Sequence, residues 1–166
     1  MTNDAAGNPL HADFYADQAV QERAEVVENV RIAEQTYRCR IRCPQMASRF
    51  LPGQFLMVRM FAGDDPLIGR PFALYDVVKN DAGDPIGIDF VYLVEGKLTS
   101  CLANVHVGHE LEVWGPLGNG FIPKPCRHLI LVAGGIGQTP FLAVAKERIG
   151  GIPFGSGGQP RETQPV

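Results

Sequence analysis

The stretch Tyr37-Arg38-Cys39-Arg40-Ile41-Arg42-Cys43, followed by Pro44, decides the fold class of this chain. Residues suited to a core alternate with arginines, and a period of two is typical of a β-strand with one buried face. Pro44 has no N–H to donate and ends the pattern. The face expected to point into a core carries Tyr37, Cys39, Ile41 and Cys43, and the three arginines are expected to form a solvated outer stripe.

Further strand-like segments lie on both sides of this stretch. They are the region from Ala24 onward, Gln54–Phe61, Pro71–Val78, Ile88–Val94 and Glu110–Trp114. Clusters rich in Gly, Pro, Asn and Asp separate them, as expected of turns. A short helix is expected over Thr99–Val105 before the last strand. About six short strands punctuated in this way predict a mainly β fold, a six-stranded antiparallel Greek-key barrel over residues 21–125.

The pattern changes after Pro125. His128–Ala133 is a continuous apolar run, which predicts a strand buried on both faces of a parallel sheet. A glycine turn follows, and Thr139 and Pro140 then predict a helix N-cap and first helical residue. This order is the opening strand–turn–helix of an α/β nucleotide-binding domain.

Four segments are therefore expected: a flexible N-terminal arm (1–20), the β-barrel (21–125), a partial nucleotide-binding α/β domain (126–149) and a loose tail (150–166). A βαβ unit takes roughly 30 residues or more, and a parallel strand needs neighbours. We therefore expect an incomplete nucleotide-binding α/β domain, in which the helix exposes the apolar residues Phe141, Leu142 and Val144.

Composition narrows the possible partners. The chain has 166 residues, a net charge of −3 and no run of Lys or Arg, which gives no reason to expect nucleic acid or an acidic membrane as a partner. No apolar stretch approaches the ~20 residues of a membrane span. The N-terminus lacks the basic and apolar regions of a secretory signal. A cytoplasmic protein with reduced thiols is expected, and its cysteines, without a C-x-x-C pair, predict no metal site.

Two short motifs have the chemistry of phosphate binding. In Arg70-Pro71-Phe72-Ala73-Leu74, the guanidinium fork suits a pyrophosphate and the aromatic ring can lie along a flavin. In Gly96-Lys97-Leu98-Thr99, a turn into a helix presents N–H groups and a hydroxyl. Each has an ordinary alternative, a strand with a surface arginine in the first case and a plain helix cap by Thr99 in the second.

The third motif is Gly134-Gly135-Ile136-Gly137-Gln138-Thr139-Pro140. It follows an apolar run and precedes a helix, as a dinucleotide-binding turn does, although its spacing is not G-x-G-x-x-G. The alternative is a tight strand–helix turn that binds no ligand.

Taken in order, these motifs, together with Tyr92 and Gly115-Pro116-Leu117-Gly118-Asn119-Gly120-Phe121, resemble the ferredoxin reductase superfamily. Within it, the chain is most similar to the FAD-containing electron-transfer subunits of NAD-dependent dihydroorotate dehydrogenases, enzymes of pyrimidine biosynthesis. The resemblance covers roughly Ala24 to Glu147.

The resemblance implies a role for each motif. Arg70 would bind the FAD pyrophosphate and Phe72 would lie by the isoalloxazine ring, while Ala73 stands where the family has a hydroxyl residue near flavin N5. The remaining implied FAD contacts are Pro71, Val91, Tyr92, Leu93, Gly96, Leu98 (a glycine in the family) and Thr99. The implied NAD pyrophosphate contacts are Gly134, Gly135, Gly137, Thr139 and Pro140.

The implied activity is hydride transfer between NAD(H) and FAD, followed by single-electron transfer to an iron–sulfur centre and a catalytic dehydrogenase subunit in a hetero-oligomer. The cofactor carries the chemistry, so no catalytic acid, base or nucleophile is expected. The family binds a [2Fe–2S] cluster through four cysteines, and none of the cysteines here matches them. Two alternatives stay open: a non-catalytic or degenerate FAD-binding module, and the reductase component of another oxidoreductase.

Overall fold

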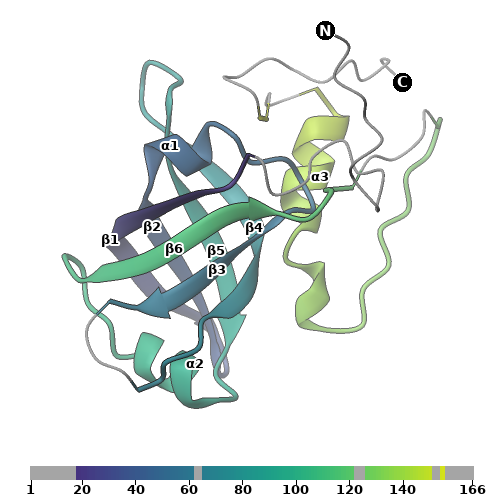
Figure 1. Ribbon diagram of the computed structural model, residues 1–166. Helices are drawn as coiled ribbons and strands as arrows, with labels where there is room; N and C mark the ends of the chain where they lie inside the picture. The colour runs from purple at the N-terminus through teal and green to yellow at the C-terminus, as the bar shows by residue number, and fades with distance from the viewer. Residues whose placement is uncertain (1–17, 62–64, 122–125, 151–153, 156–166) are drawn as a thin grey trace, which may run out of the picture.

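The computed structural model describes residues 18–61, 65–121, 126–150 and 154–155, and its main body is a closed β-barrel (Figure 1). Every strand in the barrel pairs antiparallel with its neighbours. The strands are β1 (Val20–Ala33), β2 (Thr36–Arg42), β3 (Phe55–Met60), β4 (Arg70–Lys79), β5 (Pro85–Leu93) and β6 (Glu110–Leu117).

The strand order around the barrel is β1-β2-β5-β4-β3-β6. Strands β3, β4 and β5 are consecutive neighbours, and β6 returns to lie beside β3, which is the Greek-key arrangement. The predicted six-stranded antiparallel Greek-key barrel is therefore confirmed. The proposed barrel boundary at residue 125 lies outside the described residues, as do the expected arm up to residue 17 and most of the expected tail.

Alternating side chains fill the barrel. In β2, Cys39 and Ile41 are buried, and Cys43 is buried just after the strand, as the alternation predicts. Close packing of backbone also matters, because a Cβ atom at Gly87 would lie 2.2 Å from the carbonyl oxygen of Ile41. Facing residues complete the core: Ala24, Val26, Leu56, Val58, Phe72, Leu74, Ile88, Phe90, Tyr92, Leu111 and Val113.

Two short helices lie in the connections between strands. Helix α1 (Pro44–Ala47) begins where Pro44 ends the β2 pattern. Helix α2 (Lys97–Leu102) lies between β5 and β6. It begins two residues before the expected Thr99 and ends before Val105, because Gly96 and not Thr99 is the N-cap residue.

The strand expected over residues 128–133 does not form. These residues are irregular, and Ile130 and Val132 are each 81% exposed. A parallel strand forms only when a neighbour supplies hydrogen bonds, and no strand among the described residues pairs with this segment. The apolar run was therefore a wrong indicator of strand structure here.

The turn and the helix that were expected next do form. A 3₁₀ turn, η3 (Ile136–Gln138), leads into α3 (Phe141–Arg148). The predicted cap is wrong by one position, since Pro140 and not Thr139 is the N-cap residue. The expectation of an exposed apolar face on α3 is wrong: Phe141 and Leu142 are half-buried, and Val144 is buried. The helix packs on β4 of the barrel, which supplies the cover expected from a sheet. Within the described part of the chain, no helix has the length and apolarity needed to cross a membrane.

Candidate functional site

The end of the barrel where β4 begins carries a cavity of about 330 Å³. Arg70, the first residue of β4, lines it with an exposed side chain. Its Nη1 donates to the carbonyl oxygens of Ile68 and Gly69, each at 3.2 Å. No carboxylate among the described residues forms an ion pair with Arg70, so its charge remains available to an anion.

The opposite wall of this first cavity is the turn into α2, where Gly96, Leu98 and Thr99 meet Arg70. Thr99 Oγ1 accepts hydrogen bonds from the N–H groups of Glu95 and Gly96, at 3.1 and 3.0 Å, and donates to the carbonyl oxygen of Gly96. The hydroxyl expected as a phosphate donor therefore orders the turn itself. Lys97, which pairs with Asp65, and Glu95 add one charge of each sign to the lining.

Leu98 stands where the resembled family has a glycine, and its side chain does not block the turn. It is 2% exposed and belongs to the barrel core. A Cβ atom at Gly96 would meet nothing within 4 Å, so the backbone beside it is open to a ligand.

A second cavity, of about 490 Å³, lies between the barrel and the segment that runs from η3 into α3. The first and second cavities are neighbours, because Leu93 lines both. From the expected site the second cavity also contains Val91 and Thr139. Sequence reasoning missed its other lining residues: Ile32, Ala33, Thr36, Tyr75, Ile136, Gln138 and Leu142.

The aromatic residues divide between the core and this cavity. Phe72 borders the first cavity but is 8% exposed, with its ring stacked on Phe90 at 5.0 Å. Tyr92 is buried; its hydroxyl donates to Asn29 Oδ1 at 3.0 Å, and burial raises its pKa. Tyr75, three residues beyond Phe72 and therefore on the opposite face of β4, lines the second cavity. Strand alternation was the signal that would have singled out Tyr75.

Pro71, the second residue of β4, also lines the first cavity. The other expected site residues line neither cavity. Ala73 is half-buried on β4 and pairs with Phe55 in the register of the sheet. Pro140 is buried and is the N-cap residue of α3. Gly134, Gly135 and Gly137 line neither cavity, and an added Cβ atom would meet nothing within 4 Å at any of them. Their backbone is thus open to approach.

The residues present fit a flavin dinucleotide. A guanidinium and an open glycine turn face each other in the first cavity, as an anionic pyrophosphate requires. The adjoining second cavity has the aliphatic and aromatic walls that a planar ring system requires. Each volume lies within the roughly 300–1,000 Å³ typical of small-molecule sites.

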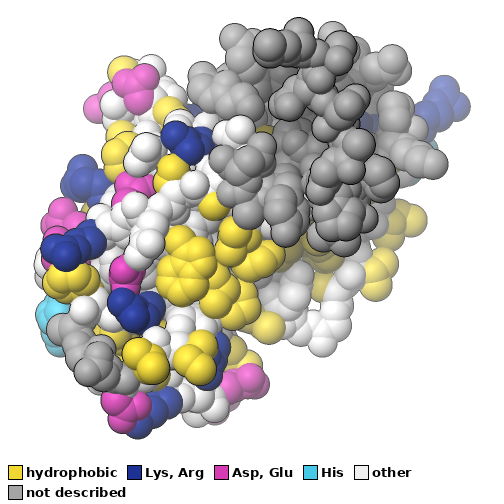
Figure 2. All heavy atoms as spheres, viewed as in Figure 1, with side chains coloured by type: hydrophobic (Ala, Val, Ile, Leu, Met, Phe, Trp, Pro, Cys, Tyr) yellow, Lys and Arg dark blue, Asp and Glu magenta, His cyan; other side chains and the backbone are white. Residues whose placement is uncertain are grey.

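A third hollow, of about 530 Å³, contains none of the expected residues. Figure 2 shows hydrophobic side chains gathered over β3 and β6, and the residues of the hollow include Met57, Ile68 and Trp114. The one arginine of the hollow, Arg59, pairs with Glu112 and does not offer a free charge. This hollow is therefore not part of the candidate nucleotide site.

The closed Greek-key barrel with two adjoining cavities has the architecture of a β-barrel that binds a small molecule. Residues 23–121 match the family described as the oxidoreductase FAD-binding domain. The chain belongs to this family, and its cofactor is FAD.

Relatives in sequence carry a more specific description. The chain is 33% identical over 130 residues to the protein "Dihydroorotate dehydrogenase B (NAD(+)), electron transfer subunit" of Fusobacterium nucleatum, a match that covers 76% of this chain and 48% of that protein. It is 37% identical over 131 residues to the protein of the same name from Geobacillus kaustophilus, covering 76% and 49%. The chain thus spans about half the length of the curated relatives it matches.

Solved structures agree on the fold. The ferredoxin reductase in carbazole 1,9a-dioxygenase superposes with a TM-score of 0.67 at 24% identity, over 79% of this chain and 40% of that one. An NADH-dependent reduced ferredoxin-NADP oxidoreductase, described in terms of flavin-based electron bifurcation, gives a TM-score of 0.63 at 28% identity, over 74% and 42%. The resemblance to the ferredoxin reductase superfamily inferred from the motifs is confirmed.

Proposed function

We propose that this chain carries the FAD-binding part of a dihydroorotate dehydrogenase electron-transfer subunit, which passes electrons between NAD(H) and an iron–sulfur or catalytic partner in pyrimidine biosynthesis. The observation that carries the proposal is the guanidinium of Arg70, which has no carboxylate partner among the described residues and lines one cavity with the open turn at Gly96, beside an apolar cavity. The names and identities of the sequence relatives support the same activity.

In this proposal, Arg70 and the backbone around Gly96 hold the FAD pyrophosphate in the first cavity. The isoalloxazine ring lies in the second cavity, against Val91, Leu93 and Tyr75. Tyr75 replaces Phe72 as the proposed ring neighbour, because the ring of Phe72 is committed to the barrel core.

The chain's own residues bind FAD, orient it and exclude water from it. Bound FAD supplies the exchange between a two-electron hydride donor and single-electron acceptors. Fixed positioning supplies much of the rate of such a transfer, and Leu93 and Leu142 keep the ring site apolar. None of these residues needs to gain or lose a proton.

The open backbone of Gly134, Gly135 and Gly137 supports a proposed approach of the NAD pyrophosphate to this turn. We further propose a partial NAD-binding domain over 126–149, a catalytic dehydrogenase partner in a hetero-oligomer, and a cytoplasmic location. The [2Fe–2S] cluster would be held by residues other than the four cysteines of this chain, all of which are free thiols.

The test is flavin loading followed by reduction. The purified protein is titrated with FAD, and binding is followed by the flavin spectrum and its fluorescence. The loaded protein is then mixed with NADH in an anaerobic stopped-flow instrument, beside a chimera that continues after Arg148 with the second half of the Geobacillus kaustophilus relative. We expect FAD binding by both proteins and much faster reduction of the chimera. Failure of the chain to bind FAD would refute the proposal.

One observation favours a second function, FAD binding without nicotinamide turnover. Residues 128–133 form no strand, so the described residues offer no sheet edge at which a nicotinamide ring would be held against the flavin. Equal and negligible reduction of the chain and the chimera, with FAD bound to both, would favour this function.

A further inference from the structure

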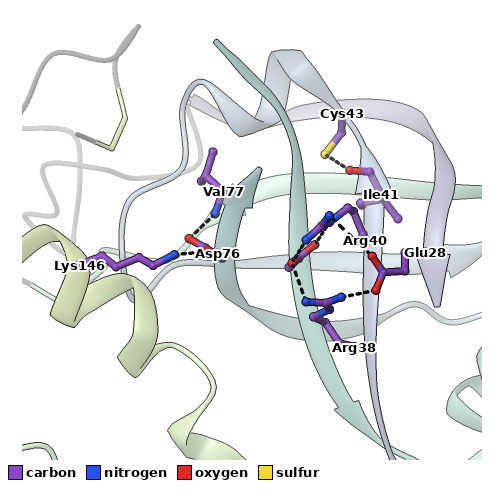
Figure 3. A network of polar contacts seen from close by, with 9 residues as sticks. Glu28, Arg38, Arg40, Ile41, Cys43, Asp76, Val77 and Lys146 are labelled. Carbon is purple, nitrogen blue, oxygen red and sulfur yellow. Dashed lines mark hydrogen bonds and ion pairs between the residues drawn. The ribbon is translucent and has the colours of Figure 1, made fainter. Parts of the chain in front are cut away.

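A ladder of alternating charges crosses the outer face of the barrel (Figure 3). Glu28 of β1 pairs with Arg38 and Arg40 of β2. Arg40 in turn donates two hydrogen bonds to Asp89 of β5, at 2.8 and 2.9 Å. The side chain of Asp89 is only 4% exposed, so its charge depends on these cations. The hydrogen bond with Asp89 raises the pKa of Arg40, and Glu28 and Asp76 add to this effect.

Asp76 of β4 extends the ladder toward helix α3. It lies opposite Asp89 in the pairing of β4 with β5, and like charges directly opposite each other on neighbouring strands repel. Lys146 of α3 pairs with Asp76, and both side chains are largely buried. Asp76 Oδ1 also accepts a hydrogen bond from the N–H of Val77 at 3.0 Å, which fixes the carboxylate on the sheet.

The barrel alone leaves this ladder one cation short. It contributes two guanidinium groups, those of Arg38 and Arg40, against three carboxylates, those of Glu28, Asp76 and Asp89. Lys146 supplies the missing positive charge from outside the barrel. The place where α3 docks is therefore specified by charge as well as by apolar packing.

The ion pair stands directly beside the second cavity. Tyr75, which lines the cavity, precedes Asp76 on β4, and a register shift between Leu74 and Asp76 interrupts the alternation so that both lie on the outer face. Leu142, which lines it from the other side, lies four residues before Lys146 and so on the same face of α3. The Asp76–Lys146 contact thus joins the two walls of the cavity one helical turn from its lining.

We propose that the Asp76–Lys146 ion pair is a positioning contact that sets the separation of α3 from β4, and with it the width of the flavin-ring cavity. The inference rests on the proposed function, because it takes the isoalloxazine ring as the occupant of the second cavity. Neither residue lines the cavity, so each acts through its neighbours Tyr75 and Leu142.

Two substitutions and their combination test the contact. Lys146→Met leaves the Asp76 carboxylate unpaired and opposite Asp89, so the dissociation constant for FAD is expected to rise about tenfold. Asp76→Asn keeps the shape and the acceptor for Val77 but removes the charge, and an about threefold rise is expected. In the double variant the repulsion is absent, and the rise is expected to stay near about threefold instead of multiplying.

The visible-region circular dichroism of bound FAD, which reports the surroundings of the ring, is recorded for each variant. Lys146→Arg keeps the cation and is expected to restore both the affinity and the dichroism. Arg42→Met is the matched control, since it breaks an exposed pair with Glu25, 3.6 Å apart, that is not part of the ladder. It is expected to change neither readout.

Effects of Lys146→Met and Asp76→Asn that multiply in the double variant would overturn the inference, and so would unchanged dichroism in all variants. If Lys146→Met does not fold, the isosteric Asp76→Asn decides by the same two readouts. An unaltered protein that binds no FAD would refute the proposed function together with this inference. Normal FAD binding by every variant would refute the positioning role alone.

Discussion

Replacing Arg70 by alanine separates binding of FAD from folding of the barrel. The guanidinium is exposed, and its hydrogen bonds within the described protein are to the carbonyl oxygens of Ile68 and Gly69, its near neighbours in sequence. These contacts at 3.2 Å tie no distant strands together. The variant should therefore unfold at nearly the temperature of the unaltered protein.

The loss of FAD affinity can be estimated from the same geometry. A charge-assisted hydrogen bond contributes about 1.5–3 kcal/mol, and exposure of Arg70 to solvent places the expected loss near the lower end, about 2 kcal/mol. This corresponds to an about 30-fold higher dissociation constant. Arg70→Lys keeps the charge without the planar fork, so an intermediate loss is expected.

The assay is titration of the FAD-free protein with FAD, followed by quenching of flavin fluorescence, with thermal unfolding measured beside it. Arg42→Ala serves as the control, since Arg42 is an exposed arginine of β2 whose partner is Glu25. An Arg70→Ala variant that folds normally and binds FAD within about twofold of the unaltered protein would refute the pyrophosphate role.

Three other predictions concern the barrel. Gly87→Ala should lower the free energy of unfolding by about 2 kcal/mol, because the new Cβ atom would lie 2.2 Å from the carbonyl oxygen of Ile41. An unchanged midpoint of urea denaturation would contradict this close packing. Cys39 and Cys43 should resist thiol reagents in the native protein and react after unfolding, because burial raises the pKa of both thiols and the thiolate is the reactive form. Rapid labelling of the native protein would contradict the burial of these residues in the barrel core. Ala73→Ser should leave the reduction potential of bound FAD unchanged in a dye-coupled titration, because Ala73 lines neither cavity; a shifted potential would instead support the place beside flavin N5 that the family resemblance implies.

The barrel could be predicted because the signals for its strands and turns lie within short stretches of the sequence. The alternation in β2 identified which side chains face the core, and turn clusters marked where strands end. The charge ladder could not be predicted in the same way. Arg38 and Arg40 were expected to be a solvated stripe, yet they pair with Asp89, about fifty positions away in the sequence. Such a pair can be predicted only when the strand order, which puts β2 beside β5, is known.

The candidate site was predictable in part for a related reason. Motif residues such as Arg70 and Gly96 meet in one cavity, as their roles required. The second cavity was missed because its walls come from both the outer face of the barrel and the segment from η3 into α3. Tyr75 carries no motif, and Leu142 was expected to be exposed. The surface of the barrel that the helix covers could not be predicted from the sequence.

The wrong strand prediction and the docking of α3 have one physical origin. Strand formation depends on hydrogen bonds from neighbours, and residues 128–133 have no strand beside them in the described structure. Helix α3 forms its backbone hydrogen bonds internally and needs only a surface for its apolar face. Strand β4 provides that surface, and the carboxylate of Asp76 fixes where on it the helix rests. The second cavity is thus bounded by the barrel and by the segment from η3 into α3. Under the proposed function, changes on this face of α3 should therefore alter FAD binding before they alter any reaction with a nicotinamide.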